Sequence, residues 1–150
     1  ELEGMDTFGS LPLYQEPMVL ALPADHPWAE RTSIALSELK GEKLLMLEDG
    51  HCLRDQAMGF CFAAGIGEDK HFQATSLETL RSMEAAGSGL TLVPKLAVNF
   101  HQDSLGVSYI PVTDPTPSRQ ISLLYRTHSV RRPCFNAMAT VIEPFLKELL

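Results

Sequence analysis

LLMLEDGHCLRDQAMGFCFAAG, residues 44–65, holds two of the three cysteines of the chain. The apolar run 44–47 has the length of a buried strand, and turn-forming residues follow it. A helix is therefore predicted to begin near His51 or Cys52 and to end at Gly65. The residues that recur at the spacing of one helical face are Leu53, Ala57, Phe60, Cys61 and Ala64. This pattern places Cys61 on the buried side of the helix and Cys52 in its first turn.

The two cysteines are expected to differ in reactivity. Cys52 would lie at the positive end of the helix dipole, between His51 and Arg54 in sequence, and these features favour the thiolate that attacks electrophiles. Cys61, among apolar neighbours, would remain a protonated and inert thiol. On a continuous helix the two Cα atoms are about 13 Å apart, whereas a disulfide tolerates roughly 7 Å. A bond between them would therefore unwind the helix. Spacing alone leaves open that both are unconnected core cysteines.

Composition is that of a soluble globular protein with one core or two small lobes, with 45% hydrophobic and 21% charged residues. Twelve Lys and Arg against 19 Asp and Glu give a net charge of −7, the wrong sign for binding DNA phosphates. No apolar run approaches the roughly 20 residues that span a bilayer, and the acidic start is no signal peptide. A cytoplasmic protein without a membrane segment is expected. Three cysteines without close spacing predict neither a metal site nor a cofactor.

The rest of the chain alternates short apolar runs with helical patterns. Strands are predicted at 11–13, 18–22, 71–74, 90–93, 107–111 and 121–125, a loop at 65–70, and a proline-containing linker at 113–118. Thr75 and Glu78 have capping-box spacing before a helix that runs to about Glu84. A final amphipathic helix contains Pro144. Strands alternating with helices predict an α/β fold with mostly parallel sheets.

Three stretches carry a resemblance to a known family. GHCLRDQAMGFC (50–61), LKGEKLLMLEDG (39–50) and SLETLRSMEAAGSGLTLVP (76–94) closely resemble the peroxide-sensing members of the LysR-type transcriptional regulators. The resemblance covers nearly the whole chain. It implies a periplasmic-binding-protein-like (type 2) effector domain with two lobes, the first incomplete. By this resemblance residues 1–15 belong to lobe I, residues 16–118 form lobe II with the redox cysteines, and residues 119–150 return to lobe I with the C-terminal helix.

The same resemblance assigns roles to individual residues. Cys52 corresponds to the peroxide-reactive thiol and Cys61 to the thiol that resolves it into an intramolecular disulfide. His51, Arg54 and Arg119 would form the thiolate or peroxide environment; the alternative for Arg119 is an ordinary surface ion pair. Thr75 and Ser76 would line the effector cleft of the wider family, or serve only as a helix cap. Cys134 has no counterpart and is expected to be a bystander.

The function implied is hydrogen peroxide sensing by a regulator. Its expected partners are hydrogen peroxide, a second copy in a homodimer or tetramer, RNA polymerase, and a cytosolic dithiol reductant such as glutaredoxin or thioredoxin. DNA would be bound only through an amino-terminal helix-turn-helix that this sequence lacks. Sensing is stoichiometric, so an enzyme is not expected. Two alternatives remain open: an effector domain that binds a small metabolite and has redox-silent cysteines, and a thiol peroxidase.

Overall fold

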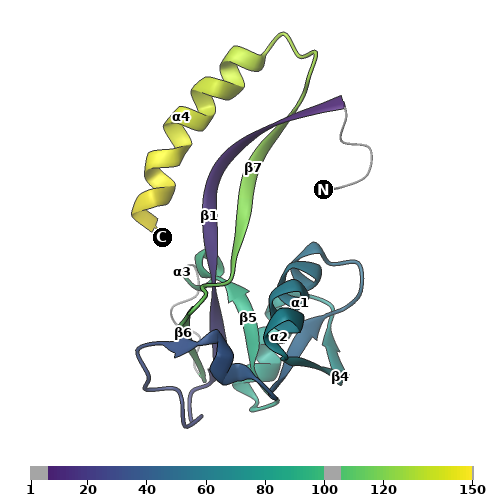
Figure 1. Ribbon diagram of the computed structural model, residues 1–150, viewed down its shortest axis with the longest axis vertical. Helices are drawn as coiled ribbons and strands as arrows, with labels where there is room; N and C mark the ends of the chain where they lie inside the picture. Colours follow the sequence, from purple (N-terminus) through teal and green to yellow (C-terminus); the bar gives the residue numbers. More distant parts are fainter. Residues whose placement is uncertain (1–6, 100–105, 150) are drawn as a thin grey trace. The chain divides into compact units, whose positions relative to one another are not determined.

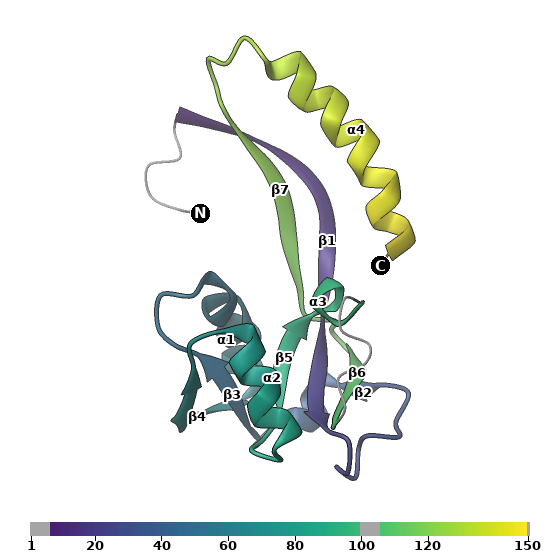
Figure 2. The same ribbon diagram turned by 180° about the vertical axis from the view of Figure 1, so that it is seen from behind.

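A computed structural model of the chain describes residues 7–99 and 106–149. The chain divides into two compact units, one of Pro17–Pro117 and one of Glu1–Glu16 with Ser118–Leu150. Figures 1 and 2 show the elements of both units from opposite sides. The predicted alternation of strands and helices is confirmed, and the protein is of the α/β class.

The Pro17–Pro117 unit contains two sheets. Its elements are the end of β1 (Phe8–Pro23), β2 (Ile34–Ala35), η2 (Leu36–Leu39), β3 (Lys43–Leu47), α1 (Cys52–Ala64), β4 (Gly67–Ala74), α2 (Leu77–Ala85), β5 (Thr91–Pro94), α3 (Lys95–Asn99) and β6 (Val107–Thr113). One sheet has the order β2-β6-β1-β5 and the other pairs β3 with β4. A parallel bridge from Leu44 to Leu90 and a 2.8 Å backbone hydrogen bond from the Leu45 N–H to Leu90 connect β3 to the residue before β5.

The sheets are mixed, so the expectation of mostly parallel sheets is wrong. β1 pairs antiparallel with both β5 and β6, while β2 with β6 and β3 with β4 are parallel. The apolar run 18–22 indicates a strand that is buried on both faces, as it is. A continuous apolar run carries no information about strand direction, which explains the error.

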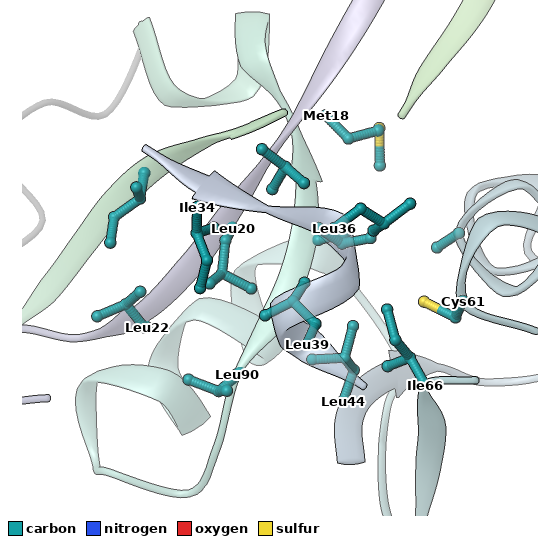
Figure 3. Packing of buried hydrophobic residues seen from close by; sticks show 14 of the residues in the cluster. Met18, Leu20, Leu22, Ile34, Leu36, Leu39, Leu44, Cys61, Ile66 and Leu90 are labelled. Carbon is teal, nitrogen blue, oxygen red and sulfur yellow. The ribbon is translucent and has the colours of Figure 1, made fainter. Parts of the chain in front are cut away.

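The core of this unit surrounds Leu20, Leu39 and Leu44, which are fully buried. Cys61, also fully buried, contributes its side chain to this core from α1 (Figure 3). Leu45, Leu47, Ala74 and Leu80 form a second cluster, in which β3, β4 and α2 pack together. The helix with the two cysteines is therefore attached to the core through Ala57 and its second cysteine, Cys61.

The other unit is built from the start of β1, β7 (Ser118–Arg126) and α4 (Arg132–Leu149). β7 pairs with β1, and the ring centroids of Tyr125 and Phe135 lie 5.6 Å apart where α4 packs on β7. Several apolar side chains of α4 are exposed, including Val141 at 61% and Phe145 at 64%. In the part of the chain that the structure describes, no helix is long and apolar enough to span a membrane.

Two predicted segments differ in the structure. The separate strands predicted at 11–13 and 18–22 belong to one strand, β1, which continues through Pro17 at the point where the chain passes between the two units. The loop predicted at 65–70 is largely the start of β4. Residues 67–70 are Gly, Glu, Asp and Lys, so no alternating apolar pattern reports the strand.

Candidate functional site

The helix α1 begins and ends where the sequence predicts. Gly50 turns the chain at a φ of 92°, and His51 then adopts an extended conformation at the N-cap position. The His51 carbonyl accepts hydrogen bonds from the N–H groups of Arg54 and Asp55, at 2.9 and 3.3 Å. At the other end Gly65 has a φ of 72°, and the Ile66 N–H donates to the Cys61 carbonyl at 2.9 Å. Glycine suits this left-handed C-terminal position because it has no Cβ.

The two cysteines of α1 have opposite environments. Cys52 is the first residue of the helix and is exposed, whereas Cys61 is fully buried. Burial raises the pKa of the Cys61 thiol to about 11, because a thiolate there would lose its hydration. Both are free thiols. Nine residues of continuous helix separate their Cα atoms by about 13 Å, well beyond the reach of a disulfide.

Arg54 binds carboxylates on both sides of the helix start. Its guanidinium forms a two-pronged ion pair with Glu68 of β4, with one N–H···O distance of 3.0 Å, and its Nε lies 2.8 Å from Asp49. It also donates to the Leu47 carbonyl at 3.2 Å. The hydrogen bond from Arg54 lowers the pKa of the Glu68 carboxyl, and a second hydrogen bond, from Gln73, adds to this. Glu68 and Asp49 are partners that sequence reasoning missed.

Arg119 also binds a carboxylate. Its Nε donates to Glu16 at 2.8 Å, and Glu16 is 1% exposed. Both residues belong to the unit formed by the two ends of the chain, while Cys52 belongs to the other unit. An ion pair is the alternative that the sequence offers for Arg119, although the Glu16 carboxylate is buried and not at the surface. A role beside Cys52 stays a prediction, as it does for the exposed His51, which makes no side-chain hydrogen bond to the start of α1.

The cap of α2 is one residue later than predicted. Ser76 is the N-cap residue, and its hydroxyl accepts a hydrogen bond from the Thr79 N–H at 3.1 Å. The capping box predicted for Thr75 and Glu78 is therefore wrong, because the helix begins at Leu77. Ser76 and Thr79 also share a hydroxyl hydrogen bond of 2.9 Å. The effector-cleft role of Thr75 and Ser76 stays a prediction.

Glu84 is a further residue whose environment sequence reasoning missed. It lies on α2, is fully buried, and neither carboxyl oxygen has a hydrogen-bond partner among the residues that the structure describes. Burial raises the pKa of Glu84 to about 8, although Arg81 one turn earlier lowers it in part. The helical spacing of Leu77, Leu80, Met83 and Glu84 was the available signal, since it places Glu84 on the inward face.

Other candidate sites add little chemistry. Among residues 7–99 and 106–149, no group of three or more His, Cys, Asp or Glu side chains is placed to hold a metal ion. Cys134 lies exposed near the start of α4, in the other unit from Cys52 and Cys61. The chemistry available to α1 is therefore that of one accessible thiol and one buried thiol on a helix that keeps them apart.

The chain is similar to regulators named for their response to peroxide. It matches the family described as "LysR substrate binding domain" over residues 3–146. It is 56% identical over 142 residues to the "Hydrogen peroxide-inducible genes activator" of Pectobacterium carotovorum subsp. carotovorum, which covers 95% of this chain and 47% of that protein. The chain therefore spans about half the length of the curated relatives it matches.

Two solved structures extend this similarity. The crystal structure of the reduced form of OxyR matches with a TM-score of 0.82 and 51% identity over 96% of this chain and 67% of that one. The oxidised form of OxyR matches with a TM-score of 0.78 and 54% identity over 96% of this chain and 68% of that one. The fold is thus similar to a regulator of which a reduced and an oxidised structure both exist.

Proposed function

Because this chain belongs to the LysR substrate-binding-domain family, we propose that it is the peroxide-sensing domain of an OxyR-like transcriptional regulator. Membership confirms the predicted fold class of a LysR effector domain. The observation that carries the proposal is the contrast on α1 between an exposed Cys52 and a buried Cys61 with a pKa of about 11. Only the first is accessible to an oxidant.

Because Cys52 is exposed and Cys61 is buried, we propose that oxidation takes place in two steps. The Cys52 thiolate attacks one oxygen of hydrogen peroxide, the O–O bond breaks, and hydroxide leaves and takes up a proton to become water. Sulfur loses two electrons and becomes a sulfenic acid. The Cys61 thiol then displaces the sulfenic hydroxyl, which departs as a second water, and the S–S bond forms. An external dithiol returns both cysteines to thiols by exchange.

The second step requires a conformational change. The Cα atoms must move from about 13 Å apart to within roughly 7 Å, so α1 cannot remain a continuous helix. Cys61 must also leave a core in which it is fully buried. The proposed signal is this rearrangement. It exposes a thiol that burial holds protonated, so Cys61 becomes reactive as it leaves the core.

The remaining expectations concern the longer protein. We assign Pro17–Pro117 to lobe II and the other unit to part of lobe I. We expect the longer protein to be a cytoplasmic homo-oligomer that contacts DNA and RNA polymerase through parts outside this chain. We expect glutaredoxin or thioredoxin to reduce its disulfide. Oxidation consumes one peroxide for each disulfide, so we do not propose an enzyme. A thiol peroxidase would instead show many turnovers with added reductant.

The test is to map disulfides by peptide mass after adding one to five equivalents of peroxide to the reduced protein. We expect a Cys52–Cys61 bond and an unmodified Cys134. The Cys134→Ser control should form the Cys52–Cys61 bond in the same yield. If no such bond forms, the sensing proposal fails. Calorimetric binding of a small metabolite by a peroxide-insensitive protein would then favour the metabolite-binding alternative.

A further inference from the structure

Arg54 connects the first turn of α1 to three neighbouring segments. Its guanidinium contacts the carbonyl of Leu47 at the end of β3, Asp49 in the turn, and Glu68 near the start of β4. The side chains of Arg54 and Glu68 are 12% and 7% exposed, whereas that of Asp49 is 88% exposed. The central ion pair is therefore largely shielded from solvent, whereas its Asp49 branch is exposed.

An irregularity in the pairing of β4 with β3 accompanies the contact between Glu68 and Arg54. Leu44 pairs with Glu68 and Met46 with Gln73, so residues 69–72 bulge out of the β3–β4 ladder between them. The bulge brings Gln73 back beside Glu68, to which its amide donates a 3.1 Å hydrogen bond. The carboxylate is thus fully engaged in the thiol form, with donors from both Arg54 and Gln73.

Arg54 lies between Cys52 and Cys61 in sequence, within the segment that must unwind for a disulfide to form. Glu68 lies on a strand outside that segment. If the first turn of α1 leaves, Glu68 loses its cation and the two hydrogen bonds that Arg54 donates to it. A partly buried carboxylate without its cation is less favourable than the ion pair. The ion pair should therefore stabilise the dithiol state relative to the disulfide state.

We propose that Arg54 and Glu68 form a latch that sets the redox potential of the Cys52–Cys61 couple by resisting the unwinding of α1. The inference rests on the proposed function. It gives Arg54 a positioning role through Glu68 rather than a direct one on the Cys52 sulfur. The latch makes the disulfide harder to form and easier to reduce, so the sensor requires a stronger oxidising signal.

The test is the midpoint potential of the couple in a Cys134→Ser background. The protein is equilibrated in dithiothreitol redox buffers at pH 7, and the disulfide fraction is measured by alkylation and mass spectrometry. Glu68→Gln should shift the equilibrium about tenfold toward the disulfide, a potential about 30 mV more negative. Glu38→Gln is the matched control, because it breaks a two-pronged pair with Arg31 whose side chains are 41% and 37% exposed. It should shift the equilibrium less than twofold.

Two further variants keep the proposal open to refutation. Asp49→Asn removes only the exposed branch, so folding should be unaffected, and it should shift the equilibrium about twofold in the same direction. Arg54→Met combined with Glu68→Gln should shift it no more than the larger single change, since both remove one interaction. Shifts no larger than that of Glu38→Gln in both Glu68→Gln and Asp49→Asn would overturn the latch. If peroxide forms no Cys52–Cys61 bond in the background protein, the proposed function fails first, and the latch with it.

Discussion

At the scale of single residues, burial separates the chemistry of two identical side chains. Cys52 is exposed at the first residue of α1, and Cys61 is fully buried at a pKa of about 11. This contrast was predictable, because helical periodicity reports which residues face inward. The partners of Arg54 and Arg119 were not, because Glu68 and Glu16 lie on strands whose pairing the sequence does not reveal.

Replacing either cysteine should trap a different species. Cys61→Ala, chosen over serine because a buried hydroxyl would lack a partner, should accumulate Cys52 sulfenic acid after one equivalent of peroxide. Cys52→Ser should leave Cys61 reduced, since that thiol is buried and protonated. Labelling with a sulfenic-acid probe followed by peptide mass measures both. Equal oxidation of Cys61 in the Cys52→Ser variant would show that burial does not protect it.

Glu84 should make stability fall as pH rises. Its pKa is about 8 in the folded protein and about 4.3 when unfolded. Between these values the folded state holds one more proton than the unfolded state, so the free energy of unfolding decreases by about 1.4 kcal/mol per pH unit. The contribution of the protonated Glu84 to the free energy of unfolding is complete below about pH 4 and is lost above about pH 8.

Chemical denaturation of Glu84→Leu and the parent protein between pH 5 and 8 measures this effect. The substitution should remove the slope and stabilise the protein most at pH 8, because leucine fills similar space without a charge. Glu78→Gln on the same helix, where the Glu78 side chain is 72% exposed, should keep the parent's slope. A slope unchanged in Glu84→Leu would mean that another group titrates.

At the scale of elements, α1 is a helix with a glycine of positive φ at each end. Its boundaries were predictable from Gly50 and Gly65, which both adopt positive φ. β4 begins at Gly67, four residues before the predicted start at His71, because GEDKHFQA has no apolar alternation. The antiparallel pairing of β1 was missed because a fully apolar strand reads the same in either direction.

Helix propensity within α1 should shift the redox equilibrium. Gly59 is exposed in mid-helix, and a Cβ there would meet no atom of residues 7–99 and 106–149 within 4 Å. Gly59→Ala should stabilise the helix by about 0.5–1 kcal/mol and favour the dithiol state two- to fivefold, roughly. The measurement is the midpoint potential in dithiothreitol buffers.

Gly65→Ala supplies the opposite change on the same helix. Gly65 has a φ of 72°, a conformation that alanine adopts at a cost of about 1–2 kcal/mol. It should weaken the helical state and favour the disulfide. If both glycine variants move the potential in the same direction, helix stability is not what opposes the disulfide.

At the scale of the whole molecule, two features matter for binding: the net charge and the division into two compact units. The net charge of −7 opposes binding to phosphates. β1 runs from one compact unit into the other, and each unit has its own packing. The exposed apolar residues Val141 and Phe145 on α4 accord with the expectation that a part of lobe I lies outside this chain.

The chain by itself should not bind DNA. Fluorescence anisotropy with a labelled double-stranded DNA at about 50 mM salt, where electrostatic attraction is strong, should show no binding in either redox state. A chain with reversed surface charge, made by replacing exposed acidic residues with lysine, is the positive control. Specific binding by the unmodified chain would contradict the assignment of DNA contacts to the remainder of the longer protein.

The central claim is that forming the Cys52–Cys61 bond and losing the helix between them are one event. Backbone amide hydrogen exchange of residues 52–65, measured in samples whose disulfide fraction is known from peptide mass, tests it most directly. The account predicts that protection of these amides falls in proportion to the disulfide fraction as peroxide is added, while protection in β1 and β5 is retained. A fully formed disulfide with α1 protection unchanged would contradict it.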